Sequence, residues 1–318
     1  MGIFSKDPAS VDTSQPDWER KLLSQLATSS LKEQRRSRRW GIFFKSLTFI
    51  YLFFIVGAVI APKFNTMGSV SEHTAYVNID GVIAANMPAN ADDINRAISR
   101  AFKNEQVTGL VLRINSPGGS AVQAGRIYDE ILRLRQEIPG KPVYAVIEDI
   151  GASGGYYIAA AAEKIYADRA SIVGSIGVRM DTFGAVEAID KLGIERRSIT
   201  AGENKALLDP FLPLVPDQVE HLEGMVEEVH QQFITAVTTV RGDKLDPDSN
   251  LFSGLIWSGE TSVDLGLVDA LGSAEYIARE VFEQPETVDY TPSQDFLQNL
   301  LQNVQLQILG QWLQPTLR

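Results

Sequence analysis

The segment Gly151-Ala152-Ser153-Gly154-Gly155 has the residue types and spacing best suited to chemistry in this chain. It fits the pattern Gly-x-Ser-x-Gly and follows the apolar run Val143–Ile147, which is typical of a buried strand. Glycines leave the serine hydroxyl unobstructed, and unpaired N–H groups at the start of a following helix favour a developing negative charge. The pattern therefore predicts Ser153 as a nucleophile for acyl transfer. A serine that only caps the helix fits the same residues.

A serine nucleophile needs a base, and histidines for this role are few. The chain contains His73, His221 and His230. The last two are nine residues apart on one predicted helix, so a rotation of about 900° places them on opposite sides. Lys205 is the better candidate, because its apolar neighbours at 206–208 could keep the amine dry and uncharged. It lies in a loop-like stretch after a strand expected at Glu195–Ile199, and an ordinary surface lysine is the other interpretation.

Two more glycine-rich turns could complete the site. Asn115–Ser120 reads NSPGGS, a turn that can expose consecutive N–H groups and so donate to an oxyanion together with Gly154. The same turn could serve only to start a helix with Ser120 as its cap. The hydroxyl of Ser175 could orient the lysine amine, or it could belong to a simple strand turn.

The elements that must position these residues alternate between strands and helices. We expect strands over 73–83, 107–114, 142–147 and 164–167, and helices over 91–103, 121–137, 154–162, 216–240 and about 273–282. On the helix over 91–103, Ile94, Ala97, Ile98 and Phe102 form one apolar stripe. This order predicts a largely parallel α/β sheet covered by helices.

An apolar run precedes this region. Residues 42–61 read IFFKSLTFIYLFFIVGAVIA, with Lys45 as their single charge, and twenty helical residues span about 30 Å, the thickness of a bilayer core. The basic cluster before it, RRSRR at 35–39, places the N-terminus in the cytoplasm and the rest beyond the membrane. The sequence predicts an uncleaved anchor. A cleaved signal peptide, with a poor cleavage site at Val59–Ala61, and a buried core helix are the alternatives.

Charge and composition exclude several classes of function. Residues 1–45 contain nine basic and five acidic residues, a net +4, so the chain total of −11 leaves −15 for the remainder. Such an acidic body argues against nucleic acid as the partner. There is no cysteine, which excludes disulfides, thiolate catalysis and cysteine-based zinc sites. No metal site and no cofactor are expected.

Six ordered motifs between about Thr74 and Gly272 resemble the bacterial signal peptide peptidase A (protease IV) family. They are NSPGG (115–119), ASGGYYIA (152–159), KIYA (164–167), GSIGV (174–178), GENKALLDPF (202–211) and SGETSVDLGLVDALG (258–272). The resemblance implies a crotonase/Clp-protease-like fold and a Ser–Lys dyad, with Ser153 as nucleophile and Lys205 as general base and later general acid. It also implies that Gly119 and Gly154 line the oxyanion hole and that Ser175 supports the lysine. Ala206 stands where an acidic residue is frequent in the family.

The expected protein is a single-pass endopeptidase of the cytoplasmic membrane whose catalytic domain is periplasmic or extracytoplasmic. The resemblance implies leftover signal peptides and other membrane-associated peptides as substrates, and a homo-oligomer of short, single-repeat subunits. We expect a cytoplasmic tail over 1–41, the anchor over 42–61, a peptidase domain over 70–285 and a C-terminal tail over 286–318. The alternatives are a crotonase-type acyl-CoA enzyme and a catalytically silent oligomeric membrane scaffold; an α/β-hydrolase lacks a suitably placed histidine.

Overall fold

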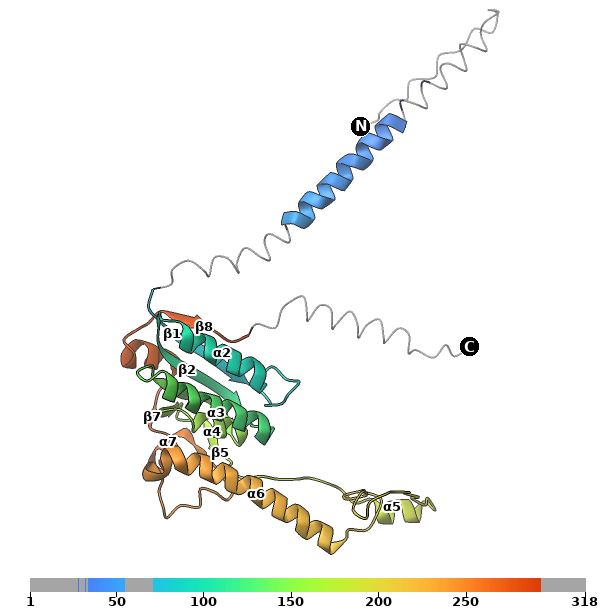
Figure 1. Cartoon of the computed structure of the whole chain (residues 1–318), viewed down its shortest axis with the longest axis vertical. Coiled ribbons are helices and arrows are strands. Elements are labelled where there is room, and N and C mark those ends of the chain that lie inside the picture. The colour runs from blue at the N-terminus through green and yellow to red at the C-terminus, as the bar shows by residue number, and fades with distance from the viewer. Residues whose placement is uncertain (1–27, 29–31, 33, 55–70, 293–318) are drawn as a thin grey trace, which may run out of the picture. The chain divides into compact units, whose positions relative to one another are not determined.

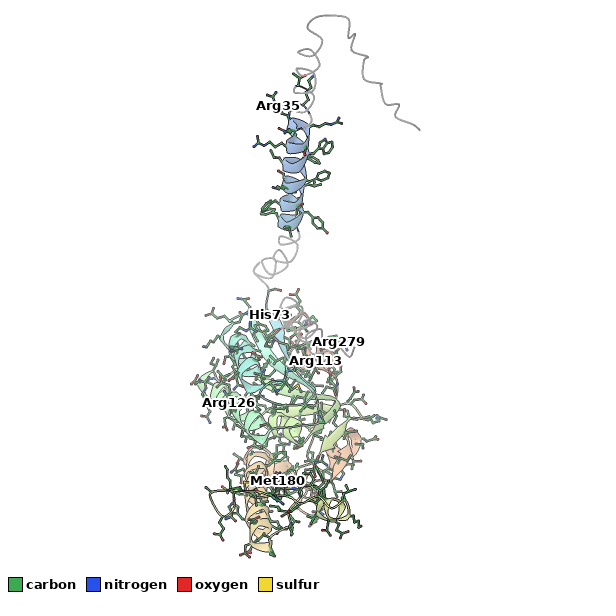
Figure 2. All side chains as sticks on the ribbon, turned by 90° about the vertical axis from the view of Figure 1, so that its right-hand side faces the viewer. Arg35, His73, Arg113, Arg126, Met180 and Arg279 are labelled. Carbon is green, nitrogen blue, oxygen red and sulfur yellow. The ribbon has the colours of Figure 1, made fainter. Side chains whose placement is uncertain are left out.

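The computed structural model describes residues 28, 32, 34–54 and 71–292. The chain divides into two units, Met1–Val70 and Ser71–Arg318. In the first unit residues 34–54 are helical, and their side chains project on all sides of the helix (Figure 2). Among the residues described, no helix combines the length and the hydropathy that crossing a bilayer requires. Three parts of the expected organisation lie outside the described residues: most of the tail over 1–33, residues 55–61 of the anchor and the tail from 293.

The second unit is built on one sheet whose strands are almost all parallel. Its described strands follow the order β6-β5-β3-β2-β1-β8, with β4 paired to β3 and β7 paired to β4. Only the edge pair β5 and β6 is antiparallel. The strands are β1 (His73–Asp80), β2 (Val107–Ser116), β3 (Val143–Ala152), β4 (Lys164–Ala167), β5 (Ile172–Gly174), β6 (Ile256–Ser258), β7 (Ala270–Leu271) and β8 (Thr287–Asp289). The expected parallel α/β architecture is confirmed.

Helices pack on this sheet through the apolar stripes that the sequence predicts. The helices are α2 (Ala91–Lys103), α3 (Ala121–Glu137), α4 (Gly154–Ala159), α5 (Val186–Lys191), α6 (Pro216–Arg241), α7 (Gly259–Asp264) and α8 (Ala274–Tyr276), with short turns η1 (Gly242–Lys244) and η2 (Ile277–Val281). In α2, the predicted stripe from Ile94 to Phe102 is fully buried in the main core. The strand expected at 142–147 runs on to Ala152, so it ends directly at Ser153.

A long arm between β5 and α6 departs from the prediction. Residues 178–215 leave the sheet, and α5 stands beyond the N-terminal end of α6 (Figure 1). The strand expected at Glu195–Ile199 is wrong: these residues have no regular secondary structure, are exposed and pair with no described strand. An isolated strand leaves its backbone groups to water, so β propensity alone does not produce one.

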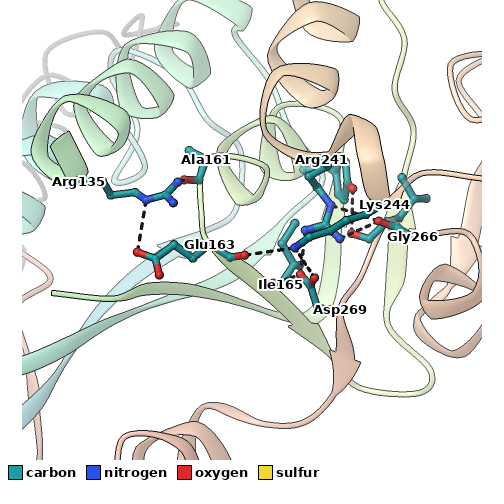
Figure 3. Close-up of polar contacts among 10 residues, drawn as sticks. Arg135, Ala161, Glu163, Ile165, Arg241, Lys244, Gly266 and Asp269 are labelled. Carbon is teal, nitrogen blue, oxygen red and sulfur yellow. Dashed lines mark hydrogen bonds and ion pairs between the residues drawn. The ribbon is translucent and has the colours of Figure 1, made fainter. Parts of the chain in front are cut away.

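The C-terminal end of α6 is fixed by a buried ion-pair network (Figure 3). Arg241, only 1% exposed, donates to Asp269 at 2.8 Å and to the Gly266 carbonyl at 2.7 Å. Asp269 also accepts from Lys244 at 2.6 Å and from the Ile165 N–H at 2.7 Å. Burial alone would raise the pKa of Asp269, but the hydrogen bonds from Arg241 and Lys244 outweigh it and hold that pKa below its ordinary value of 3.8. The network joins α6 to β4 and to the segment before β7.

Asp269→Asn should lower the free energy of unfolding by about 3 kcal/mol, because it leaves the Arg241 guanidinium buried without an anion. Urea denaturation measures this difference. Since the pKa of Asp269 is depressed in the folded state, its stabilisation is present above the ordinary value and is lost as the pH falls through the folded-state pKa. The gap between wild type and variant should therefore close in acid.

Asp149→Asn is the matched control, because Asp149 is an exposed carboxylate of β3 with no ion pair to another described residue. It should change the free energy of unfolding by less than about 0.5 kcal/mol. An equal loss in both variants would show that the Arg241 network is not a special contributor to stability.

Candidate active site

Ser153 occupies a strained turn between β3 and α4. Its backbone has φ +51° and ψ −123°, a left-handed conformation that costs a residue with a side chain on the order of 1–3 kcal/mol. The Ser153 N–H donates to the Gly174 carbonyl at 2.9 Å, and its carbonyl accepts from the Tyr157 N–H at 2.9 Å. The hydroxyl makes no capping bond to α4. Ser153 therefore occupies the N-cap position of α4 without capping it through its side chain, and its hydroxyl is left available.

The turn is held by close backbone contact with the loop after β2. A Cβ added to Gly118, where φ is +99°, would lie 2.7 Å from both the Ser153 Cβ and the Gly154 N. A Cβ on Gly155 would lie 2.8 Å from the Ser116 carbonyl oxygen. The Ser116 hydroxyl in turn donates to the Gly81 carbonyl at 2.6 Å. Glycine at 118 and 155 is thus what allows the two turns to meet.

This contact brings together the two predicted oxyanion donors. A Cβ on Gly154 would lie 3.3 Å from the Gly119 N. The backbone hydrogen bonds of these turns leave the N–H groups of Gly119 and Gly154 without an acceptor in the described chain. The Ser120 hydroxyl accepts a hydrogen bond from the Gln123 N–H and so caps α3. The loop therefore starts a helix and also presents the free N–H of Gly119. Two such donors beside a serine can stabilise an oxyanion.

Ser153, Gly119, Gly154 and Ser175 all line one cleft of about 1120 Å³. The Ser175 N–H donates to the Leu255 carbonyl at 2.7 Å, and its backbone is also left-handed, with φ +50°. Because Gly174 accepts from the Ser153 N–H, the end of β5 places Ser175 close to the turn of Ser153. Four of the five residues expected at the site therefore share one cleft.

Lys205 is placed elsewhere. It lies on the arm between β5 and α6, its side chain is exposed, and it does not line the cleft of Ser153. The neighbouring residues 206–208 are only half-buried, so within this single chain they do not provide the dry surroundings expected for the amine. One hydrogen bond joins the arm to the first turn of α6: the Gln218 side-chain amide donates to the Asn204 Oδ1 at 2.9 Å.

The cleft also contains residues that the sequence does not point to. Tyr157 stacks on Phe233 of α6, with ring centroids 4.8 Å apart, and meets Tyr128 of α3 edge-on at 5.3 Å. His230 lines the cleft as well, whereas His221 is exposed. The His230 Nε2 is shielded from solvent and has no hydrogen-bond partner in the described residues. Only the three-dimensional meeting of α3, α4 and α6 identifies these positions, because they are far apart in sequence.

Gly118→Ala should lower kcat/KM for peptide hydrolysis by about 100-fold, because the new methyl group would displace Ser153 and Gly154 from their contact. Steady-state kinetics measure the effect. Gly140→Ala is the matched control: φ at Gly140 is +101°, close to the +99° of Gly118, but its added Cβ would meet nothing within 4 Å. Both variants carry the same backbone strain, so equal kinetic losses would refute the steric explanation.

Comparison with known proteins places this arrangement in a family. Residues 135–287 match peptidase family S49. The chain is 44% identical over 185 residues to a protein of Brucella abortus named Na(+)/H(+) antiporter NhaA, covering 58% of this chain and 25% of that protein. It is 31% identical over 183 residues to the chloroplastic serine protease SPPA of Arabidopsis thaliana, covering 57% and 27%. It is 30% identical over 210 residues to slr0021 of Synechocystis sp., provisionally named a protease, covering 65% and 72%.

The chain spans about a quarter of the length of the first relatives that it matches. The slr0021 match extends over most of both chains, and the S49 match includes the turn of Ser153. The chain belongs to peptidase family S49.

Proposed function

We propose that this chain is a membrane-anchored endopeptidase that degrades cleaved signal peptides and other membrane-associated peptides through a Ser–Lys dyad. Ser153 attacks the peptide carbonyl, and the N–H groups of Gly119 and Gly154 hold the oxyanion. The lysine takes the serine proton and returns it to the leaving amine; water then releases the acyl group from Ser153. The fold is proposed to be that of the crotonase and Clp-protease group.

The observation that supports this proposal most is the state of the Ser153 turn. Its left-handed backbone, uncommitted hydroxyl and two adjacent free N–H groups occur together at the wall of a cleft. A strained backbone of this kind persists only where surrounding contacts fix it, and such sites are concentrated where residues react.

The base is proposed to be Lys205 of a second copy of the chain. A base must come within about 3 Å of the serine hydroxyl, yet Lys205 lies on an exposed arm and outside the cleft of its own chain. The arm also carries exposed apolar side chains: Phe183 is 70% exposed, Leu192 73% and Ile199 fully. An apolar, projecting segment of this kind is suited to packing on a neighbouring subunit. That packing would also supply the dry surroundings that a neutral amine needs.

His230 is a weaker candidate for the base. Its ring lines the cleft, but the Nε2 is out of contact with solvent, and the Nδ1 lies 3.9 Å from a Glu227 carboxylate oxygen. Neither nitrogen has a hydrogen bond to the Ser153 hydroxyl in the described chain.

The membrane anchor is proposed from the run over 42–61. In its described part, up to residue 54, the large apolar side chains are exposed around the whole helix; Phe49 is 75% exposed and Phe53 76%. Such a surface is unfavourable in water and favourable in lipid. With the arginines at 35–39 on the cytoplasmic side, the peptidase unit lies on the extracytoplasmic side.

Ser153→Ala and Lys205→Ala should each reduce signal-peptide cleavage to background when purified alone. Co-expressed with different tags and isolated as mixed oligomers, they should recover about a quarter of wild-type activity, because one site in four draws both intact residues from neighbouring subunits. Cleavage of a signal peptide, followed by mass spectrometry, measures this. Mixed oligomers without activity would contradict a lysine supplied by a neighbour.

His230→Gln separates the two candidate bases. It should retain most of the wild-type cleavage rate, whereas Lys205→Ala retains none. If His230→Gln had only background activity and Lys205→Ala had normal activity, His230 and not Lys205 would be the general base.

The absence of cysteine from the chain allows a direct test of topology. Thr13→Cys should be protected from a membrane-impermeant maleimide in spheroplasts and become labelled after lysis. Glu105→Cys, at an exposed position just before β2, should be labelled in intact spheroplasts. The opposite labelling pattern would reverse the proposed orientation. Detergent-treated samples, in which both cysteines should be labelled, show that each cysteine is able to react.

A further inference from the structure

The cleft extends from Ser153 along the groove between α3 and α6, and its charges are unequally matched. Besides Tyr157, its ionisable lining residues are Arg126, Asp129, Arg179 and His230. Arg126, labelled in Figure 2, pairs with Asp92 at 2.5 Å, and Arg179 pairs with Asp181 at 3.3 Å. The carboxylate of Asp129, an exposed residue, has neither an ion pair nor a side-chain hydrogen bond with any residue that the structure describes. The groove therefore contains one uncompensated carboxylate.

Apolar and aromatic residues line the cleft together with Asp129. Gly125 lies one helical turn before it and lines the cleft, and a Cβ there would be 4.0 Å from the Tyr157 hydroxyl, so Tyr157 lies beside this turn of α3. Val122, another turn back and 69% exposed, also lines the cleft. Asp129 and Tyr157 line the same cleft. Burial, and after it the negative charge of Asp129, raise the pKa of Tyr157. Phe233, stacked on Tyr157, completes this lining.

This combination fits a long side chain with a positive end. The aliphatic stem of a lysine or arginine can lie on aromatic and aliphatic surface while its charged head reaches a carboxylate. The face of an aromatic ring also attracts the cation. An acidic side chain would meet Asp129 with like charge, and an apolar one would leave the carboxylate without a partner.

We propose that Asp129 is a specificity-determining residue that selects peptides with a lysine or arginine a few residues from the scissile bond. The inference rests on the proposed role of Ser153, which fixes where the bond lies. Eight residues separate Asp129 from Ala121, the first residue of α3 beside the oxyanion loop, a rise of about 12 Å. An extended peptide covers that distance in about three to four residues.

The test uses pairs of peptides that differ only in lysine or norleucine, which has a stem of equal length without the charge. The lysine is moved through each position on both sides of the scissile bond, and the two peptides compete in one reaction. Wild type should favour lysine by about fivefold at one position about three residues from the bond. Asp129→Asn should bring the ratio of kcat/KM close to one, and Asp129→Lys should favour a glutamate peptide instead.

The preference should shrink as salt is added, which a purely structural effect of the substitution would not produce. Asp149→Asn is the matched control, since Asp149 is exposed, lies outside the cleft and, like Asp129, has no ion pair with a described residue, and it should keep the wild-type ratio. A wild-type ratio of one at every position, or an unchanged ratio in Asp129→Asn, would overturn the inference.

A binding measurement separates this inference from the proposed nucleophile. Fluorescent peptides of each pair are titrated into the uncleaving Ser153→Ala protein with and without Asp129→Asn. Tighter binding of the lysine peptide that Asp129→Asn removes supports the role of Asp129 whatever residue is the nucleophile. Equal binding of both peptides overturns it, whereas continued cleavage by Ser153→Ala would overturn only the assignment of Ser153.

Discussion

The site depends on the direct contact of two backbone turns, one after β2 and one after β3. Strands β2 and β3 are parallel neighbours, with Ser116 paired to Gly151, so their ends meet at the same edge of the sheet. Glycines at 118 and 155 remove the side chains that would keep these turns apart, as their virtual Cβ contacts of 2.7 and 2.8 Å show. The contact fixes Ser153 in a conformation that it would not adopt alone. The energy of the packed sheet is thus what maintains the strained serine.

A second constraint separates the fixed part of the molecule from its projecting part. The buried residues of α6 are Phe233, Ala236, Val237 and Arg241, all near its C-terminal end, where Arg241 binds Asp269. The N-terminal half of the same helix has no buried side chain and continues into the arm that carries Lys205. One end of the helix therefore forms a wall of the cleft, while the other extends away from it. A helix of 26 residues spans about 39 Å, which is enough to reach the neighbouring subunit of the proposed oligomer.

The sequence predicted the elements whose patterns are local and complete. The bounds of α2, α3 and β4 agree with the structure, because capping residues and apolar stripes determine them. It also brought Gly119, Ser153, Gly154 and Ser175 forward as one site, and they share a cleft. The expected strand at 195–199 was wrong, because a strand needs a neighbouring edge that sequence does not reveal. The surroundings of Lys205 could not be predicted for a similar reason. The burial of a side chain depends on what packs against it, and the local sequence does not specify that partner. The acyl-CoA alternative does not agree with membership of peptidase family S49, whereas cleavage by the purified protein is what would contradict the silent-scaffold alternative.

The charge distribution links the cleft to the rest of the chain. Residues after 45 carry a net charge of −15, so the peptidase unit attracts cationic peptides before any contact is made. Within the cleft both arginines are neutralised by aspartates, and Asp129 alone keeps a free charge among the described lining residues. Long-range attraction and the local carboxylate therefore favour the same class of substrate. A cationic segment held at Asp129 places the peptide along α3, and the cleft then brings its backbone to the oxyanion donors at the start of that helix, so binding at one end of the groove orients the bond that Ser153 attacks.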